Sequence, residues 1–191
     1  IQNKHLPKEL YKSHYADRLP IGKKEILEKF SYETIRKFYH DWYRPDLMAF
    51  IAVGDFDIDM IEKRIKENFV KLQNPANERP RTKFDVPLHG NTIISIAGDK
   101  ELQYQNASLI FKRAQESTVM VKDYRRDMIS ALYDAMLNER YQEIVKKGDP
   151  PFLFAGAGDG EFLGDVKAFS MYVGLKPEGL EKGMRAPLQE L

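Results

Sequence analysis

Two helical patterns flank an apolar run in the first half of the chain. Apolar residues recur at helical spacing across residues 31–42, and Ser31 can cap the amino terminus of that helix. Residues 47–53 are apolar without interruption, which is typical of a strand buried on both faces. A second helical pattern covers residues 58–70, with Asp57 as its cap. This half therefore predicts a helix, a strand and a helix.

The second half of the chain predicts strands around a long helix. We expect strands at 92–97, 107–112, 152–157 and 166–175, and helices at 121–147 and from 177 onward. The glycine-rich stretch 158–160 predicts the turn between the last two strands. Pro187 is a poor interior residue for the final helix and indicates a kink or an early end.

Three prolines within residues 73–87 predict an extended linker. The expected organisation is a polar segment at 1–30, the helix, strand and helix of 31–72, this linker, and a second unit at 88–191. The predicted fold class is α+β: an antiparallel or mixed sheet with helices packed on one face, arranged as two unequal lobes.

Composition narrows the possible functions. The chain has 191 residues, 30 basic and 29 acidic side chains and a formal net charge of +1, so it offers no strong field for a nucleic-acid backbone. The absence of cysteine excludes a disulfide framework, a zinc finger and a thiol nucleophile. No apolar run is long enough to span a membrane. The chain starts at Ile1 and not at methionine, so we expect a piece of a longer protein.

The sequence contains no compact catalytic motif. Zinc proteases place two histidines one helical turn apart, in the order His-x-x-Glu-His or its inverse. The four histidines here are not spaced in this way: they are His5, His14, His40 and His89. A serine elbow is also absent, and Asp55 and Asp57 precede a helix, where capping is their expected role. The residues alone indicate a binding or scaffold domain and leave a metal site built from distant residues open.

One block of the sequence resembles the M16 zinc peptidases, the family of pitrilysin, insulin-degrading and mitochondrial-processing peptidases. Residues 38–48 are similar to the family pattern F-Y-x-x-W-Y-x-P-x-N-M, and the apolar run that follows ends in Gly-Asp-Phe-Asp, similar to V-G-D-x-D. Residues 19–22 resemble the family's P-I-G stretch, and residues 137–144 resemble the end of its L-x-x-R-L-x-x-E-L helix.

The resemblance implies a position within a larger enzyme. In this family the zinc motif precedes the matched region, so the chain is identified as a C-terminal-type M16 segment from a bacterial member. The implied function is a non-catalytic wall of the substrate chamber, with Zn²⁺ in the parent and none on this chain. The implied partners are peptide substrates and the remaining M16 domains. The alternative is a segment of an inactive structural or processing subunit, and an unrelated ligand-binding α+β domain is a third possibility.

Five individual residues depart from or match positions with a known role in the family. Members use an arginine and, seven residues later, a tyrosine to hold the substrate, and the matching positions here are Val145 and Phe152. Neither side chain can donate a hydrogen bond, so the resemblance implies the zinc-bearing half or a degenerate copy. The family's exosite, which anchors a substrate amino terminus, falls near Asp134, Asn138 and Glu139. The solvated side of a helix is the simpler interpretation of these three.

Two further expectations concern association and location. The run 47–53 would expose unpaired backbone if it were separated from a parent sheet, so we expect it to dock on residues 88–191 or to pair with another copy. The resemblance implies a bacterial protein and leaves the periplasm and the cytoplasm open.

Overall fold

The computed structural model describes residues 2–191, and they form two compact units. The larger unit combines residues 2–19 with residues 83–191, and the smaller unit comprises residues 20–82. The division places the polar amino-terminal segment partly in each unit, because the first helix packs with residues from beyond position 83.

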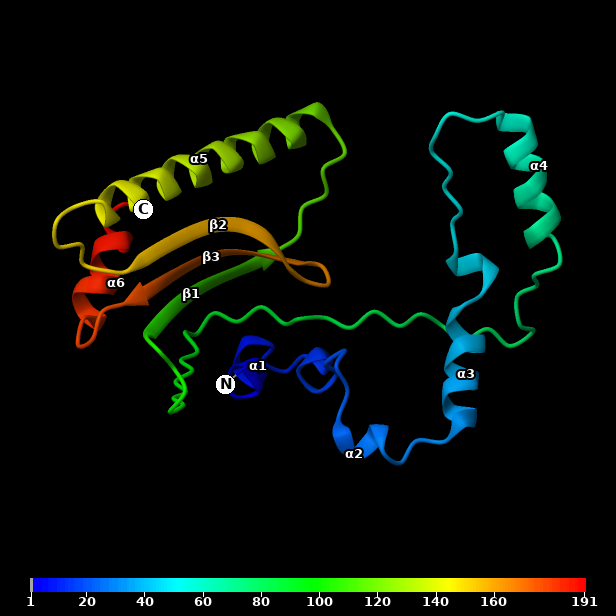
Figure 1. The fold of residues 1–191 in the computed structure, drawn as a ribbon, viewed down its shortest axis with the longest axis horizontal. Helices are drawn as coiled ribbons and strands as arrows, with labels where there is room; N and C mark the ends of the chain where they lie inside the picture. The colour runs from blue at the N-terminus through cyan, green and yellow to red at the C-terminus, as the bar shows by residue number, and fades with distance from the viewer. Residues whose placement is uncertain (1) are drawn as a thin grey trace. The chain divides into compact units, whose positions relative to one another are not determined.

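The larger unit is built on a three-stranded antiparallel sheet (Figure 1). Its strands are β1 (Gln105–Ala114), β2 (Phe154–Leu163) and β3 (Val166–Leu175), in the spatial order β1-β3-β2. The central strand β3 pairs along its whole length with both neighbours, while β1 and β2 each have one outer edge. The α+β class is confirmed.

Two helices cover one face of this sheet. The long helix α5 (Val121–Val145) and the short helix α6 (Leu180–Leu188) share one core with the strands. The buried side chains of that core are Leu137, Tyr141, Ile144, Phe152, Ala155, Ala157, Met171, Val173 and Leu175. On β3 these members alternate, as expected for a strand with one face toward a helix. Only the carboxyl-terminal half of α5 contributes buried residues.

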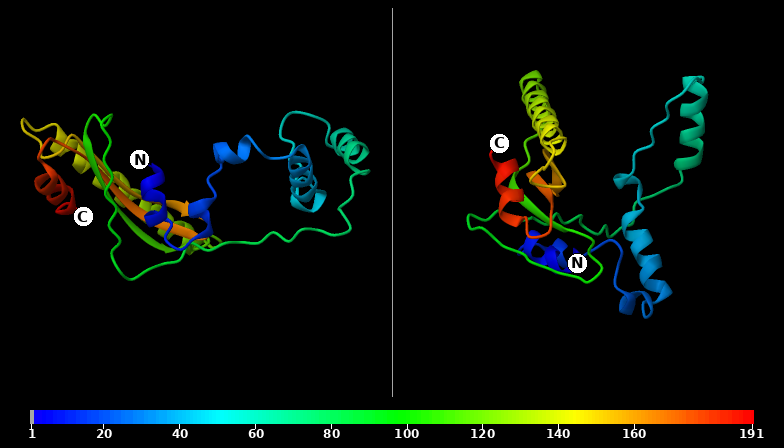
Figure 2. Two further views of the ribbon diagram at one scale, coloured as in Figure 1. Left: turned by 90° about the horizontal axis from the view of Figure 1, so that it is seen from below. Right: turned by 60° about the vertical axis from the view of Figure 1, so that its left-hand side comes forward.

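A smaller cluster lies on the opposite side of the sheet, where α1 (Gln2–Glu9) packs (Figures 1 and 2). Leu6 and Leu10 contact Val86 and Val166, and Val166 has the opposite parity to the β3 residues under α5. Lys112 donates a hydrogen bond to the backbone carbonyl of Glu9, and burial lowers the pKa of this lysine. The 3₁₀ turn η1 (His14–Asp17) follows, with its Ser13 cap bonded to Asp85.

The turn predicted at residues 158–160 is wrong. These residues lie inside β2, and the hairpin reverses at Gly164 and Asp165, between Leu163 and Val166. Gly164 has a φ of 60°, which matches the glycine that type II′ hairpin turns require at their first position. The glycine at 158 serves another purpose, because α5 approaches β2 closely there.

The smaller unit consists of helices joined by extended chain. Its elements are α2 (Lys24–Leu27), α3 (Tyr32–Trp42), the 3₁₀ turn η2 (Pro45–Leu47) and α4 (Ile58–Phe69). Ser31 accepts a hydrogen bond from the Thr34 N–H at 3.2 Å, and Asp57 accepts one from the Met60 N–H at 2.8 Å. Both predicted caps and both predicted helices are confirmed.

Two predicted strands are not formed. Residues 48–53 are extended but make no strand ladder, because the structure describes no partner strand within residues 20–82. Their side chains are accordingly exposed, to 81% at Ile51 and 91% at Val53. Residues 92–97 are also extended without a ladder, although Ile94 and Ile96 alternate with less exposed neighbours as in a strand.

Candidate functional site

Polar side chains converge where α5 passes along β2. Asn138 donates from Nδ2 to the carbonyl of Ala157 at 2.6 Å and accepts from the Ala157 N–H at 3.1 Å. One turn earlier, Asp134 accepts a hydrogen bond from the Asp159 N–H at 2.9 Å. Residues 157 and 159 point the same way along the strand, toward the edge that faces away from β3. The two side chains therefore take the place of a neighbouring strand.

These hydrogen bonds determine which polar groups of the three exosite candidates are left to bind a ligand. Asp134 and Asn138 are half-buried and their hydrogen-bonding capacity is directed at β2. A Cβ atom on Gly158 would lie 3.3 Å from an Asp134 carboxylate oxygen, so a side chain at 158 would press on this contact. Glu139 points to solvent and forms no ion pair within residues 2–191. The structure thus brings Asp134 and Asn138 together and leaves Glu139 apart from them.

An ion pair next to this cluster was not apparent from the sequence. Arg113 on β1 reaches across β3 to the carboxylate of Asp159 on β2. The two residues are 46 positions apart, and only the strand order β1-β3-β2 brings them together. The pair fixes the Asp159 side chain on the same stretch of β2 whose backbone Asp134 holds.

The two positions that the resemblance aligned with the family's arginine and tyrosine, Val145 and Phe152, pack in or against the core. Phe152 is fully buried, with its ring centroid 6.3 Å from that of Tyr141, and Val145 packs against the same cluster. Tyr141 donates its hydroxyl to the carbonyl of Pro187 at 3.1 Å, and burial raises the pKa of this phenol to about 12. Pro187 lies in the last turn of α6, where its carbonyl accepts this bond in addition to one from the Glu190 N–H at 3.3 Å.

The histidines do not form a metal centre. Within residues 2–191, no three histidine, aspartate or glutamate side chains are grouped so that they could hold a metal ion. His5 is hydrogen-bonded to Ser95 at 2.8 Å, His89 meets the Asn91 carbonyl at 2.7 Å, and the ring of His14 packs on Phe84. The side chains present therefore do not fit a zinc ion by themselves.

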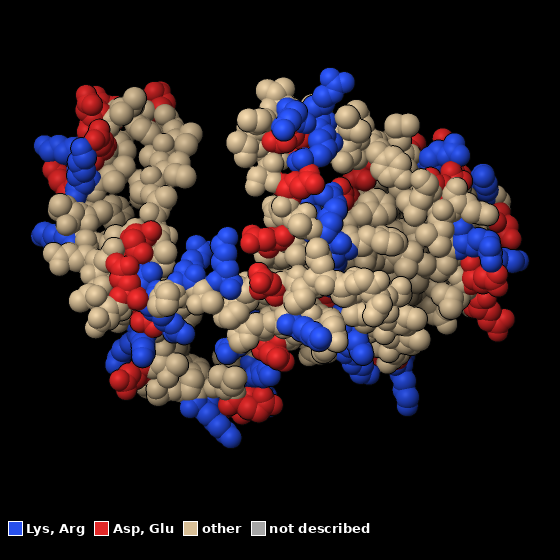
Figure 3. Space-filling view, turned by 180° about the vertical axis from the view of Figure 1, so that it is seen from behind, with Lys and Arg blue, Asp and Glu red and all other residues tan. Residues whose placement is uncertain are grey.

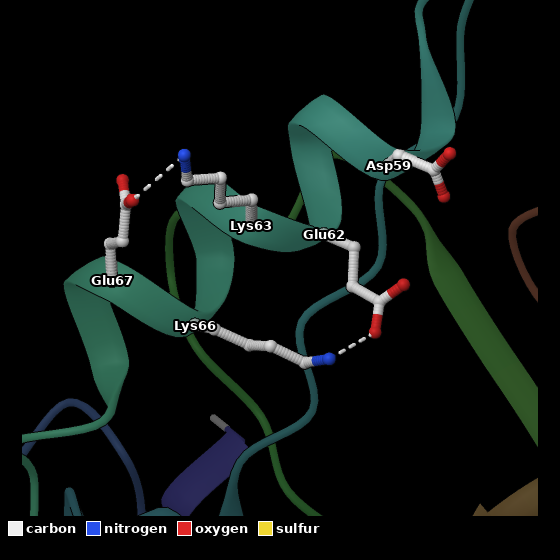
Figure 4. A pocket seen from close by; sticks show the side chains of 5 residues that line it. All are labelled: Asp59, Glu62, Lys63, Lys66 and Glu67. Carbon is white, nitrogen blue, oxygen red and sulfur yellow. Dashed lines mark hydrogen bonds and ion pairs between the residues drawn. The ribbon is translucent and has the colours of Figure 1, made fainter.

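The charged surface is mixed in sign. Figure 3 shows lysine and arginine side chains interspersed with aspartate and glutamate, without a continuous basic area on this face. A shallow hollow on α4 lies between two ion pairs, Lys63 with Glu67 and Lys66 with Glu62 (Figure 4). Its charged groups already pair along one helix, so it is a solvated helix face and not a binding pocket.

None of the described helices is long and apolar enough to cross a membrane.

A family model for the "Peptidase M16 inactive domain" matches residues 29–191. The chain belongs to the M16 peptidase family. The predicted resemblance is therefore confirmed, and the matched range includes α5, the whole sheet, Val145 and Phe152.

Curated M16 relatives carry zinc protease names. A protein of Arabidopsis thaliana called "Zinc protease PQQL-like" is 31% identical over 153 residues, which cover 80% of this chain and 16% of the relative. The "Probable zinc protease PqqL" of Haemophilus influenzae is 30% identical over 149 residues, or 77% of this chain and 16% of the relative. The chain thus spans less than a fifth of the length of these proteins.

Solved M16 proteases share the fold. The first half of the periplasmic protease PqqL from Escherichia coli matches with a TM-score of 0.75 and 21% identity, over 99% of this chain and 40% of that one. The ferredoxin protease FusC, solved in complex with Arabidopsis ferredoxin, matches with a TM-score of 0.75 and 19% identity, over 99% of this chain and 21% of that one.

Proposed function

We propose that the chain is a non-catalytic part of an M16 zinc metallopeptidase and helps to form the wall of its substrate chamber. The observation that carries this proposal is the pair of core positions Val145 and Phe152. Where the resemblance expects groups that hold a substrate backbone, this chain has a buried phenylalanine and a half-buried valine that packs against the same core. Neither side chain can donate a hydrogen bond to a peptide, which supports a structural contribution from these two positions.

Three observations support the parent activity that we propose, which is hydrolysis of peptides with Zn²⁺ bound elsewhere. The curated relatives are named zinc proteases and are several times longer than this chain. One structural neighbour was solved with a protein bound, which supports a polypeptide as the substrate class. The described residues do not fit zinc on their own, so the ligands would come from other segments of the parent.

We also propose that residues 47–53 pack against another segment of the parent. Seven consecutive apolar residues without a strand partner are costly to leave in water, and Ile51 and Val53 are almost fully exposed. Amide hydrogen exchange tests this directly. We expect fast exchange at these residues in the isolated chain and protection in the full-length parent.

Substrate anchoring and compartment are narrower proposals. Of the three exosite candidates, Glu139 is the one with a free carboxylate, so any anchor for a peptide α-ammonium on this helix would rest on Glu139. A solved neighbour is described as periplasmic, which supports the periplasm for the parent. The relatives come from a plant as well as from bacteria, so the bacterial origin stays a proposal.

The deciding experiment measures metal and activity together. The purified chain is loaded with zinc, desalted and analysed by elemental mass spectrometry, and then assayed with a fluorescence-quenched peptide library. We expect no stoichiometric zinc and no cleavage. Zinc bound at one equivalent, with cleavage that a chelator abolishes, would contradict the non-catalytic role. An upstream sequence in the parent with His-x-x-Glu-His favours the peptidase, and a parent without that motif favours the alternative of an inactive processing subunit.

A further inference from the structure

Residues 124–136 of α5 carry an apolar surface that no described element covers. Met128, Leu132 and Met136 are 49%, 61% and 70% exposed, and Tyr124 is 62% exposed. The carboxyl-terminal half of the same helix buries Leu137, Tyr141 and Ile144 against the sheet. The exposed residues are therefore on the side of the helix that points away from its own core.

These four residues form one stripe. They follow each other at intervals of four positions, so each lies about one turn above the last, and the stripe turns by about 40° around the helix at each step. From the first to the last they cover about 18 Å of helix length. Four large apolar side chains in a row on a solvent-facing helix indicate a protein contact more than they indicate a solvated surface.

Charges of opposite sign stand at equal distances from the middle of the stripe. Arg125 lies seven positions before Leu132, and Glu139 lies seven positions after it. Two helical turns return a residue almost to the same face, so both charges lie in line with the stripe. Both are exposed, and neither forms an ion pair with any residue that the structure describes. The face is thus basic at one end, apolar in the middle and acidic at the other.

We propose that this face of α5 is an interface with a second copy of the chain. In an antiparallel pair of α5 helices that cross at Leu132, this residue meets its own counterpart, and Met128 meets Met136. Arg125 of each copy then faces Glu139 of the other, so both ion pairs form at once. A surface that complements itself after a twofold rotation is what an isologous dimer needs. The charges also disfavour the parallel arrangement, in which like charges would meet.

The expected association is weak. One helix pair covers less than the roughly 1,200 Å² that stable interfaces bury, so we expect dissociation in the micromolar range or above. The proposal does not depend on the peptidase function, and it differs from association through residues 47–53, which would not respond to charges on α5. It also predicts that raising the salt concentration loosens the dimer, since the two ion pairs are solvent-exposed.

The test is a charge swap in the whole 191-residue chain, followed by sedimentation velocity over a concentration series. Arg125→Glu and Glu139→Arg should each lose dimer formation, because like charges then face each other. An equimolar mixture of the two variants should regain it as a heterodimer, and the double variant should regain it as a homodimer. Association that is equal in all variants, or a wild-type monomer throughout the series, would overturn the proposal.

A crosslinking experiment locates the contact independently. The chain has no cysteine, so Leu132→Cys introduces a single thiol at the proposed twofold axis. A short bismaleimide should join two copies of this variant. Leu180→Cys, at an exposed position on α6, serves as the matched control and should not be crosslinked, because its thiol lies away from the proposed contact. Equal crosslinking of both variants would show that the contact does not involve α5.

Discussion

Replacing Asn138 with alanine tests the role of the polar cluster between α5 and β2. The wild-type side chain makes three hydrogen bonds, two to the backbone of Ala157 and one to the carbonyl of Asp134 at 2.6 Å. Ala157 is 8% exposed, so water has little access to its N–H and C=O groups once the amide is gone. The variant therefore leaves one donor and one acceptor of β2 without a partner.

The loss of unfolding free energy in Asn138→Ala follows from the unpaired N–H and C=O groups of Ala157. A buried polar group without a partner destabilises a fold by about 1–3 kcal/mol, whereas a satisfied hydrogen bond contributes only about 1 kcal/mol net. Because the groups lie at a strand edge that water can partly reach after truncation, we expect about 3 kcal/mol in total. That is a large share of the roughly 5–15 kcal/mol that stabilises a typical domain.

Urea unfolding followed by far-ultraviolet circular dichroism measures this effect. The control is Gln142→Ala, which removes a similar amide from an exposed position one turn further along α5. The single tryptophan, Trp42, lies in the smaller unit, so its fluorescence transition should keep its midpoint in both variants. If Asn138→Ala unfolded within about 0.5 kcal/mol of the control, the side chain would not act as a substitute strand, and our reading of the cluster would be refuted.

Three further changes follow from individual contacts. Tyr141→Phe should destabilise the larger unit by about 1 kcal/mol, because the buried hydrogen bond from the Tyr141 hydroxyl to the Pro187 carbonyl is lost. The pKa of Tyr141 is raised to about 12 in the folded state, above the value of about 10 expected in the unfolded chain. The stability that this phenol contributes should therefore be lost as the pH rises from about 10 to about 12. A pH series of unfolding midpoints should show this loss for the wild type and not for Tyr141→Phe. Asp57→Ala should cost about 1 kcal/mol by removing the cap of α4, which tryptophan fluorescence during urea unfolding can report. Gly183→Ala should cost about 1–3 kcal/mol, because its new Cβ would lie 2.5 Å from the buried side chain of Leu175, and a thermal melt should show a lowered midpoint.

The helices and the central hairpin were predictable because their signals are local. A serine or aspartate before an amphipathic run caps a helix whatever the rest of the chain does, as Ser31 and Asp57 illustrate. The position of the hairpin turn was not predictable. Gly158 and Gly160 have turn composition, yet Asp134 holds the backbone between them in a strand from 25 positions away. The sequence around residues 158–160 contains no signal for this hydrogen bond from Asp159 to Asp134.

Two apolar patterns predicted burial that the structure of the described residues does not show. The run 47–53 has the composition of a buried strand, and residues 124–136 have the spacing of a helix face in a core. In the structure both are exposed, since a strand needs a neighbouring strand and a helix face needs a facing surface. The spacing of apolar residues indicates a surface that is stabilised when another surface covers it. It contains no information on which segment, or which molecule, supplies that partner.

Different parts and faces of the long helix α5 thus have different roles. Its carboxyl-terminal half is committed to the fold through three buried apolar residues, and its polar residues Asp134 and Asn138 are committed to the edge of β2. A substitution there changes stability before it can change recognition. Any surface on this helix that is free to bind must therefore lie on the side of Leu132 and Met136, which face away from the core. Substitutions on that side should change binding without changing the stability of the larger unit, because these side chains make no contact with its core.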